Sequence, residues 1–373
     1  MLVKRPIKVC LVSPLPPPYG GISIWTQMIA NFALMQPSVV LRHIDTAPRH
    51  RAIYQTSTLR RIWGGVPQMV STALNLEREI RRESPDVVHL NTSGQLALIR
   101  DALVVLLARA HRVPVVYHLR FGRVPVILAK RNVEGRAIAF VARRVHTVIA
   151  LDPATESAMN QFMPGVRSER IPNCVDLATL PETRDGLGVQ ENTALFVGWV
   201  IPSKGIAELL QAWSSLDLPG WRLVIAGPGD EVYRDVLRSM VGQSQSVDFL
   251  EEVAHDEALQ LMASCDLFVL PSHTEGFPNV VLEAMALGRA ILATDVGAIG
   301  SMLADGCGVV VPPRNVKALR EAISDVTSNA ELRRAIGDAA RVRARSWYSL
   351  PVVFAQYENL WRCLSDLVEN EAD

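Results

Sequence analysis

Residues 270–288 read LPSHTEGFPNVVLEAMALG. The pattern predicts a buried strand that ends at Leu270, a loop that holds Glu275, and a helix that opens at Pro278, where the missing proline N–H is tolerated. The first amides of that helix, from Asn279 to Val281, lack partners within the helix, and such amides bind anions. This stretch therefore predicts an α/β fold with a diphosphate site at the carboxyl end of a strand.

Two carboxylates flank this predicted anion site. Glu275 lies in the loop, and Glu283 lies one to two turns into the helix. Carboxylates accept hydrogen bonds from hydroxyl groups, so the pair suits the hydroxyls of a sugar or a ribose. The alternative is that Glu275 is a solvated loop charge and Glu283 a surface residue of the helix.

Short β-branched runs alternate with segments of helical period along the whole chain. Runs such as 7–12 and 86–90 in the first half, and 194–197 and 267–270 in the second, are separated by segments such as 22–34. This alternation is typical of parallel sheets. We therefore expect two Rossmann-like, doubly wound parallel-sheet domains facing across a cleft.

The length of 373 residues also suits two domains. A strand ends in a proline turn at residues 170–176, which predicts a first domain over 1–172 and a second over 173–347, followed by a terminal segment over 348–373. Ligands of doubly wound sheets bind at the carboxyl ends of the strands, so we expect the chemistry there.

Composition indicates a globular cytoplasmic protein. The chain is 49% hydrophobic and 20% charged, and no apolar run reaches the roughly 18 residues that span a bilayer. The apolar run at residues 7–12 enters a proline loop without a small-residue cleavage site, which favours a first strand over a signal peptide. Five scattered cysteines without a CxxC spacing argue against a disulfide framework and a structural zinc site.

Charge is divided unevenly along the chain. Residues 1–172 hold 23 Lys+Arg against 10 Asp+Glu, and the remainder holds 15 against 28. The halves carry +13 and −13, which points to an anionic surface or substrate facing the first half. A chance placement of solvated charges is the alternative. Neither half contains a nucleic-acid-binding motif, so we expect no nucleic-acid partner.

The residues around the two glutamates resemble the retaining glycosyltransferases of family 4. The hallmark of that family is two glutamates separated by seven residues in an EGF…LEAMA…G setting, present here from Glu275-Gly276-Phe277 to Gly288. Other segments match in the same order: residues 196–198, 204–205, 226–229, 247–250, 265–272 and 294–297. The match covers nearly the whole second half, and the first half rests on Gly20-Gly21, His118 and residues 171–173.

This resemblance implies a GT-B architecture in which the second domain binds a nucleotide sugar and the first binds the acceptor. It implies that the terminal segment forms a helix that crosses back to the first domain. By the same resemblance, we expect Glu275 to contact the transferred sugar, Glu283 to contact the ribose, and His118 to lie near the anomeric carbon. The expected catalytic residues are His118, Lys204 and Glu275. The expected donor-binding residues are Gly20, Gly21, Gly198, Lys204, Leu250, Val253, Glu275, Gly276, Phe277, Pro278, Asn279, Val280 and Glu283.

Two positions depart from the family pattern. Trp199 stands where the family commonly has an arginine that contacts phosphate, and Glu251 stands where it often has glycine. Arg120 or Arg123 is a candidate replacement for the missing phosphate contact. The positive charge of Lys204 offsets charge that develops on a leaving diphosphate.

We expect no metal and no cofactor. The chain contains no Asp-x-Asp pair, which is the usual carboxylate clamp for a metal-bound diphosphate. Lys204 and the helix amides are the expected replacement for such a metal.

A basic amphipathic segment spans residues 120–144. Basic residues that include Arg120, Arg123, Lys130 and Arg131 alternate there with apolar ones. Such a surface suits an anionic leaflet or a lipid diphosphate, which predicts a peripheral position on the inner face of the cytoplasmic membrane. The alternative is an ordinary solvated helix face over a core.

We expect the chain to transfer a sugar from a nucleotide diphosphate sugar to a glycan or polyprenyl-linked saccharide in bacterial polysaccharide or glycolipid biosynthesis. Retention of anomeric configuration is implied by the resemblance alone. One alternative is a GT-B epimerase or hydrolase that acts on nucleotide sugars. Another is a non-catalytic partner subunit, which Trp199 favours and which the intact Glu275 and Glu283 oppose.

Overall fold

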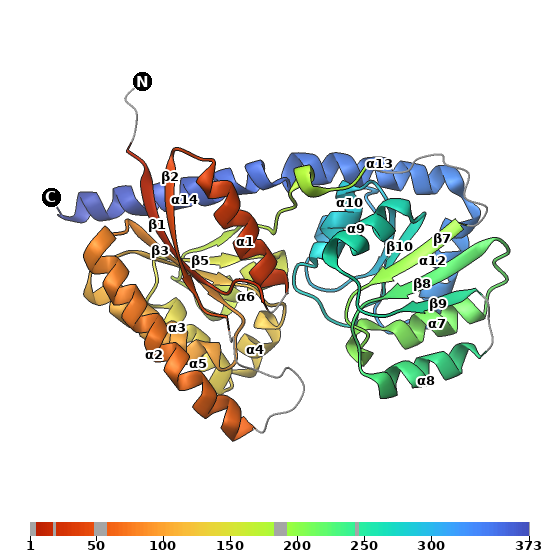
Figure 1. Ribbon diagram of the computed structural model, residues 1–373, viewed down its shortest axis with the longest axis horizontal. Helices are drawn as coiled ribbons and strands as arrows, with labels where there is room; N and C mark the ends of the chain where they lie inside the picture. Colours follow the sequence, from red (N-terminus) through yellow and green to blue (C-terminus); the bar gives the residue numbers. More distant parts are fainter. Residues whose placement is uncertain (1–4, 18–19, 48–57, 183–191, 243–245, 373) are drawn as a thin grey trace. The chain divides into compact units, whose positions relative to one another are not determined.

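The computed structural model describes residues 5–17, 20–47, 58–182, 192–242 and 246–372. The chain forms two compact units (Figure 1). The first contains Met1–Asn173 together with Pro351–Asp373, and the second contains Cys174–Leu350. Residues 183–191, which follow the predicted boundary between the two domains, lie outside the described residues.

The first unit is built on a parallel sheet of six strands in the order β2-β1-β3-β4-β5-β6. Its strands are β1 (Ile7–Ser13), β2 (Val39–Asp45), β3 (Val87–Thr92), β4 (Val115–Leu119), β5 (Thr147–Ala150) and β6 (Ser168–Arg170). Its helices are α1 (Gly21–Leu34), α2 (Thr58–Glu83), α3 (Ala97–Ala110), α4 (Val124–Lys130), α5 (Val133–Ala142), α6 (Pro153–Phe162) and most of α14 (Leu350–Ala372).

The second unit repeats this plan with the order β12-β11-β10-β7-β8-β9, again all parallel. Its strands are β7 (Asn192–Val197), β8 (Trp221–Ala226), β9 (Val247–Leu250), β10 (Leu267–Leu270), β11 (Ala290–Thr294) and β12 (Val309–Val311). Its helices are α7 (Ile206–Ser214), α8 (Glu231–Val241), α9 (His255–Ser264), α10 (Asn279–Ala286), α11 (Ile299–Met302), α12 (Val316–Ser328) and α13 (Ala330–Trp347), with short 3₁₀ turns η1 (Leu177–Thr179) and η2 (Pro202–Lys204).

The strand order of the second sheet reverses direction between β7 and β10. From β7 the chain moves outward through β8 to β9, and it then returns to the other side of β7 with β10. The loops that follow these two central strands diverge at such a reversal, which leaves room for a ligand at the carboxyl edge of the sheet. The fold thus places the loop after β7 beside the loop after β10.

Residues 270–288 form the predicted strand, loop and helix. β10 ends at Leu270, and α10 begins at Asn279, with Pro278 as its N-cap. Pro278 therefore precedes the helix by one residue. All four residues of β10 are buried, as its apolar sequence predicts for the centre of a parallel sheet.

The basic segment forms two short helices. α4 ends where Arg131 adopts a left-handed conformation with φ of 49°, and α5 restarts at Val133, after Asn132 accepts a hydrogen bond from the N–H of Gly135 at 2.8 Å. One end of each helix is thus exposed around residues 130–133. No helix within the described part of the chain is both long and apolar enough to cross a bilayer.

Helix α14 completes the core of the first unit. Trp361 is fully buried, and its indole N–H donates to Nδ1 of His89 on β3 at 3.1 Å. Tyr357 stacks on Trp361 with ring centroids 5.9 Å apart, and it meets Trp25 of α1 edge-on at 5.6 Å. Trp361 and His89 are 272 positions apart in the sequence. The last helix of the chain therefore covers one face of this sheet through aromatic contacts.

We expect Trp361→Ala to destabilise the first unit by about 3–5 kcal/mol, because it leaves a large cavity and an unpaired imidazole nitrogen. Native-state hydrogen exchange of peptides from β3 and β4 measures this loss. Trp347→Ala is the matched control, because Trp347 is 60% exposed, and it should change stability by about 0.5 kcal/mol or less. Equal losses in the two variants would contradict the structural role of α14.

Candidate functional site

An ion pair joins the two strands at the order reversal of the second sheet. Lys204 ends the turn η2 that follows β7, and Glu275 lies in the loop that follows β10. The Lys204 ammonium donates to Oε1 of Glu275 at 2.6 Å, and the Ser272 hydroxyl donates to the same oxygen at 2.6 Å. Two residues 71 positions apart, both predicted from the sequence as catalytic, are thus in direct contact.

A close backbone approach holds these two loops together. Gly205 has φ of +68°, and a Cβ added there would lie 2.0 Å from the carbonyl oxygen of Pro271. The N–H of His273 donates to the carbonyl of Ser203 at 2.8 Å, and its ring contacts Glu208 at 2.8 Å. Only glycine permits this approach, so Gly205 fixes Lys204 against the loop that carries Glu275.

The loop after β11 supports the same turn from its other side. Gly297 has φ of +60°, and a Cβ there would lie 2.4 Å from the carbonyl oxygen of Gly276. The N–H of Ala298 donates to that oxygen at 2.8 Å. The Glu275-Gly276 turn is therefore held between two neighbouring loops, which pre-orients the Glu275 carboxylate.

Helix α10 begins directly after this turn. Its first residues are Asn279 and Val280, and the N–H of Val281 bonds the carbonyl of Pro278 at 3.2 Å. The N–H of Val281, which the sequence predicted to be open, is thus engaged by the Pro278 carbonyl, and the N-terminal amides of the helix carry partial positive charge. Phe277, next to them, is buried and meets the ring of Tyr348 at 5.7 Å, which anchors the start of the helix.

Glu283 lies on the second turn of α10 and is largely buried. Its Oε1 lies 3.7 Å from Nε2 of His255, the first residue of α9. Burial raises the pKa of the Glu283 carboxyl, and the charge of His255 opposes that shift. Sequence reasoning missed His255, because nothing in the chain order marks α9 as the neighbour of α10.

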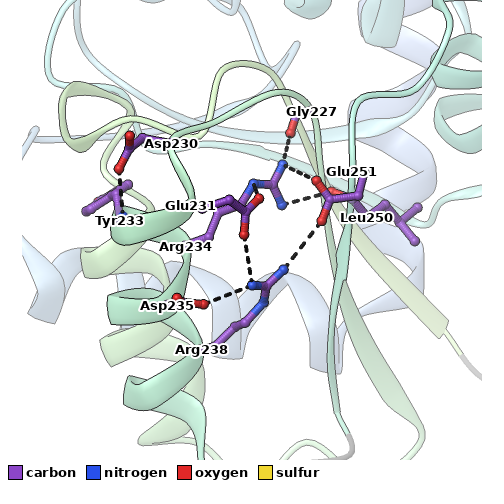
Figure 2. A network of polar contacts seen from close by, with 9 residues as sticks. All are labelled: Gly227, Asp230, Glu231, Tyr233, Arg234, Asp235, Arg238, Leu250 and Glu251. Carbon is purple, nitrogen blue, oxygen red and sulfur yellow. Dashed lines mark hydrogen bonds and ion pairs between the residues drawn. The ribbon is translucent and has the colours of Figure 1, made fainter.

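The remaining predicted donor residues of the second unit lie along the carboxyl edge of β7, β8 and β9. The N–H of Gly198 bonds the carbonyl of Ala226 at 3.0 Å, and Leu250 ends β9. Val253 lies in the loop between β9 and α9. A buried arginine, Arg234, donates hydrogen bonds to the carbonyls of Gly227, after β8, and Leu250, at the end of β9 (Figure 2).

In the first unit, His118 lies at the carboxyl end of β4, as predicted, but its side chain is fully buried. Its Nδ1 lies 3.2 Å from Nε2 of His89, and its ring meets Trp25 edge-on at 5.5 Å. Burial and the nearby Arg120 charge lower the pKa of His118, so the imidazole is neutral. Arg120 packs over Trp25 at 4.1 Å and donates to the side chain of Asn173 at 2.7 Å.

The two predicted glycines of the first unit open helix α1. Gly20 is its N-cap, and Gly21 is the first helical residue. Both residues are exposed. Among the described residues, no atom lies within 4 Å of a Cβ added at Gly20, so no contact with them requires glycine at that position.

Arg123, Lys130 and Arg131 are exposed on α4 and the turns that flank it. Arg123 lies 3.4 Å from Glu134, an ion pair within the basic segment. Across the described ranges, no three His, Cys, Asp or Glu side chains are grouped in a way that could hold a metal ion.

Two glycosyltransferase family models match the two halves of the chain. The family model for glycosyl transferases group 1 matches residues 182–343, and the model for the glycosyl transferase 4-like domain matches residues 2–174. The phosphatidyl-myo-inositol mannosyltransferase of Mycolicibacterium smegmatis is 33% identical over 210 residues, which are 54% of this chain and 53% of that protein. The match to an uncharacterised glycosyltransferase of Methanocaldococcus jannaschii is 32% identical and covers 39% of this chain and 41% of that one. The chain thus spans about half the length of these relatives.

Two solved structures share the fold over nearly the whole chain. The sucrose-phosphate synthase of Thermosynechococcus elongatus has a TM-score of 0.77 at 19% identity, covering 96% of this chain and 99% of that one. Anabaena HepE in complex with UDP and glucose has a TM-score of 0.72 at 19% identity, covering 96% and 100%. With both units matched by family models and the two parallel sheets matched in structure, the chain belongs to the group 1 glycosyltransferases of GT-B fold.

Proposed function

We propose that the chain transfers a sugar from a nucleotide diphosphate sugar to a glycan or polyprenyl-linked saccharide, with retention of anomeric configuration. The observation that carries this proposal is the Lys204–Glu275 contact of 2.6 Å at the reversal between β7 and β10. A cation, a carboxylate and the first amides of α10 converge there, and together they suit a diphosphate linked to a sugar.

Each group has a separate role in the proposed reaction. Lys204 and the first amides of α10 stabilise negative charge on the departing diphosphate, because their positive ends are already in place before the bond breaks. Glu275, held by Ser272 and Lys204, accepts hydrogen bonds from the hydroxyls of the transferred sugar. Glu283 accepts hydrogen bonds from the ribose hydroxyls of the nucleotide.

We propose attack on the same face that the diphosphate leaves, in which the leaving phosphate takes the acceptor proton. The Glu275 carboxylate is engaged by two donors, which makes it a hydrogen-bonding group rather than a covalent nucleophile. Metal is not required in this scheme, since Lys204 and the helix amides supply the positive charge.

The first unit binds the acceptor in this proposal. His118 is buried, so we assign it an indirect role, in which it packs against Trp25, the ring over which the Arg120 guanidinium lies. The name of one relative, the phosphatidyl-myo-inositol mannosyltransferase, supports a role in glycolipid biosynthesis, and the HepE complex shows UDP and glucose bound to a protein of this fold.

Nucleoside diphosphates should raise the melting temperature, because a ligand at 100 times its Kd stabilises the folded state by about 2.7 kcal/mol.

By calorimetry, Glu283→Ala should weaken nucleoside diphosphate binding roughly tenfold, through loss of a hydrogen bond to a charged group. Glu275→Ala should lower the affinity for the intact nucleotide sugar by a similar factor. Glu257→Ala, an exposed change on α9, is the control. Unchanged affinities in both site variants would refute the proposed site.

Lys204→Met should lower kcat by about 10²–10³, the usual loss when one preorganised transition-state donor is removed. Lys317→Met removes a lysine that is exposed on α12 and should leave kcat unchanged.

Wild-type activity should survive EDTA, and proton NMR of the product should show the donor's anomeric configuration. Activity that EDTA abolishes and magnesium or manganese restores would overturn the metal-free scheme, and an inverted product would overturn retention.

We also propose that the α4–α5 turn contacts an anionic membrane surface. Val126 and Val133 are 55% and 82% exposed beside Lys130 and Arg131, so apolar and basic side chains share one surface. Exposed valines lose contact with water in the headgroup region, and the cations attract anionic lipids.

Liposomes rich in anionic lipid should retain the protein at low salt and release it as salt rises, because screening shortens the range of the attraction. Lys130→Glu/Arg131→Glu should abolish retention, since each basic residue near the surface contributes about 1 kcal/mol. Lys317→Glu/Arg320→Glu carries the same charge change on α12 of the second unit and should leave retention intact. Equal retention of both double variants in a sedimentation assay would exclude this surface.

A further inference from the structure

Arg234 is a fully buried arginine on the first turn of α8. Its guanidinium lies under the carboxyl ends of β8 and β9, where it meets the backbone of two loops (Figure 2). Arginine is almost never fully buried unless it is paired, and here both Nη groups are bonded whereas Nε has no hydrogen-bond partner among the described residues. The contacts of Arg234 therefore indicate what the burial achieves.

The main partners of Arg234 are two backbone carbonyls. Its Nη1 donates to the carbonyl of Leu250, the last residue of β9, at 3.2 Å, and its Nη2 donates to the carbonyl of Gly227, the residue after β8. The N–H of Gly227 in turn donates to the carbonyl of Glu251 at 3.2 Å. Arg234 thus bridges the exits of two neighbouring strands that diverge into separate loops.

The two carboxylates near the Arg234 guanidinium lie on exposed side chains. Glu251 lies 3.7 Å from Nη2 and Glu231 lies 3.8 Å from Nε, and their side chains are 68% and 64% exposed. Arg238 contacts the same two carboxylates at 3.4 and 3.3 Å. Exposed ion pairs contribute little, so the carbonyl bonds, rather than these pairs, explain the buried position of Arg234.

The loop after β9 that Arg234 helps to hold carries Leu250 and Val253, two residues predicted from the sequence to bind the donor. A Cβ added at Gly227 would lie 2.1 Å from the carbonyl oxygen of Gly198, so the loop after β8 packs directly on the loop after β7. A Cβ at Gly229 would lie 2.7 Å from Cβ of Val200 and 3.3 Å from Nε of Arg234. The arginine thus fills the space beneath the place where the three loops meet.

Lys204 is held by other contacts. Its ammonium bonds Glu275, and Gly205 packs against Pro271 of the loop after β10. Lys204, which stabilises the diphosphate in the proposed reaction, is therefore held by the loop after β10. The loops after β8 and β9 are held by Arg234. This division separates the group that positions the nucleoside from the group that stabilises the leaving diphosphate.

We propose that Arg234 is a positioning residue for the nucleoside of the donor: by holding the carbonyls of Gly227 and Leu250, it fixes the loops after β8 and β9, to which we assign the base. This inference rests on the proposed function. It predicts that Arg234 affects the affinity for the nucleotide and leaves the chemical step of the bound donor nearly unchanged.

Three variants separate this role from a general structural one. Arg234→Lys keeps the charge but lacks the planar fork that reaches two carbonyls at once. Arg234→Met keeps the length of the side chain and removes both donors. Arg238→Met is the matched control, because Arg238 contacts Glu251 and Glu231 from the same helix but bonds neither carbonyl.

In calorimetry and steady-state kinetics, Arg234→Lys should raise the Kd of the nucleoside diphosphate and the KM of the donor roughly tenfold or more. Its kcat at saturating donor should stay within about threefold of wild type, since Lys204 and Glu275 are untouched. Arg238→Met should match wild type in all three values. If Arg234→Met does not fold, as judged by circular dichroism, Arg234→Lys alone carries the test.

Either of two binding results would overturn the inference: a folded Arg234→Lys protein that binds the nucleoside diphosphate as wild type does, or an equal loss in Arg238→Met, which would trace the effect to the shared carboxylates. A loss of kcat without a change in KM would also contradict it. Failure of wild type to bind any nucleoside diphosphate would instead refute the proposed function, so the two failures are distinguishable.

Discussion

The contact between Lys204 and Glu275 is the interaction on which the second unit's site depends. It joins the loops after β7 and β10, the two central strands between which the strand order reverses. A doubly wound sheet produces one such reversal, and the ion pair lies at it. Because both side chains are mostly buried and Ser272 adds a second donor to Glu275, the pair fixes a cation and a carboxylate in register before any ligand arrives.

Lys204 and Glu275 can hold these positions only because the backbones of neighbouring loops come close to each other around the site. Gly205 meets Pro271, Gly297 meets Gly276, and Gly227 meets Gly198, each at a distance that a Cβ would block. Gly205, Gly297 and Gly227 all have positive φ, and all follow the carboxyl ends of strands. The packing of the loops therefore sets the precision of the site, and the side chains of Lys204 and Glu275 depend on that packing for their positions.

The sequence predicted the α/β class, the strand, loop and helix at residues 270–288, and the glutamate-bearing loop, because each rests on local patterns: β-branched runs, a proline before a helix, and residue spacing. It could not predict His255 or Arg234 as parts of the site, because their partners lie on other elements and only the tertiary fold brings them together. It also missed Ser272, whose partner Glu275 lies three residues further along the same loop, because a sequence pattern does not show which way a loop side chain points. His118 was placed correctly at the end of β4, but its burial depends on Trp25 and Tyr357, which come from helices distant in sequence.

The two departures from the family pattern differ in their physical consequences. Glu251 puts a carboxylate where the family often has glycine, and Arg234 and Arg238 lie within 3.7 Å of it, so the added charge is offset locally. Trp199 has the opposite effect, since it removes a cation from the loop after β7 and brings no charge in return. In the proposed reaction, the phosphate charge that an arginine there would offset must then be balanced elsewhere. Within this unit that balance falls to Lys204 and the first amides of α10, which gives a reason for the firm attachment of Lys204 to the loop that precedes that helix.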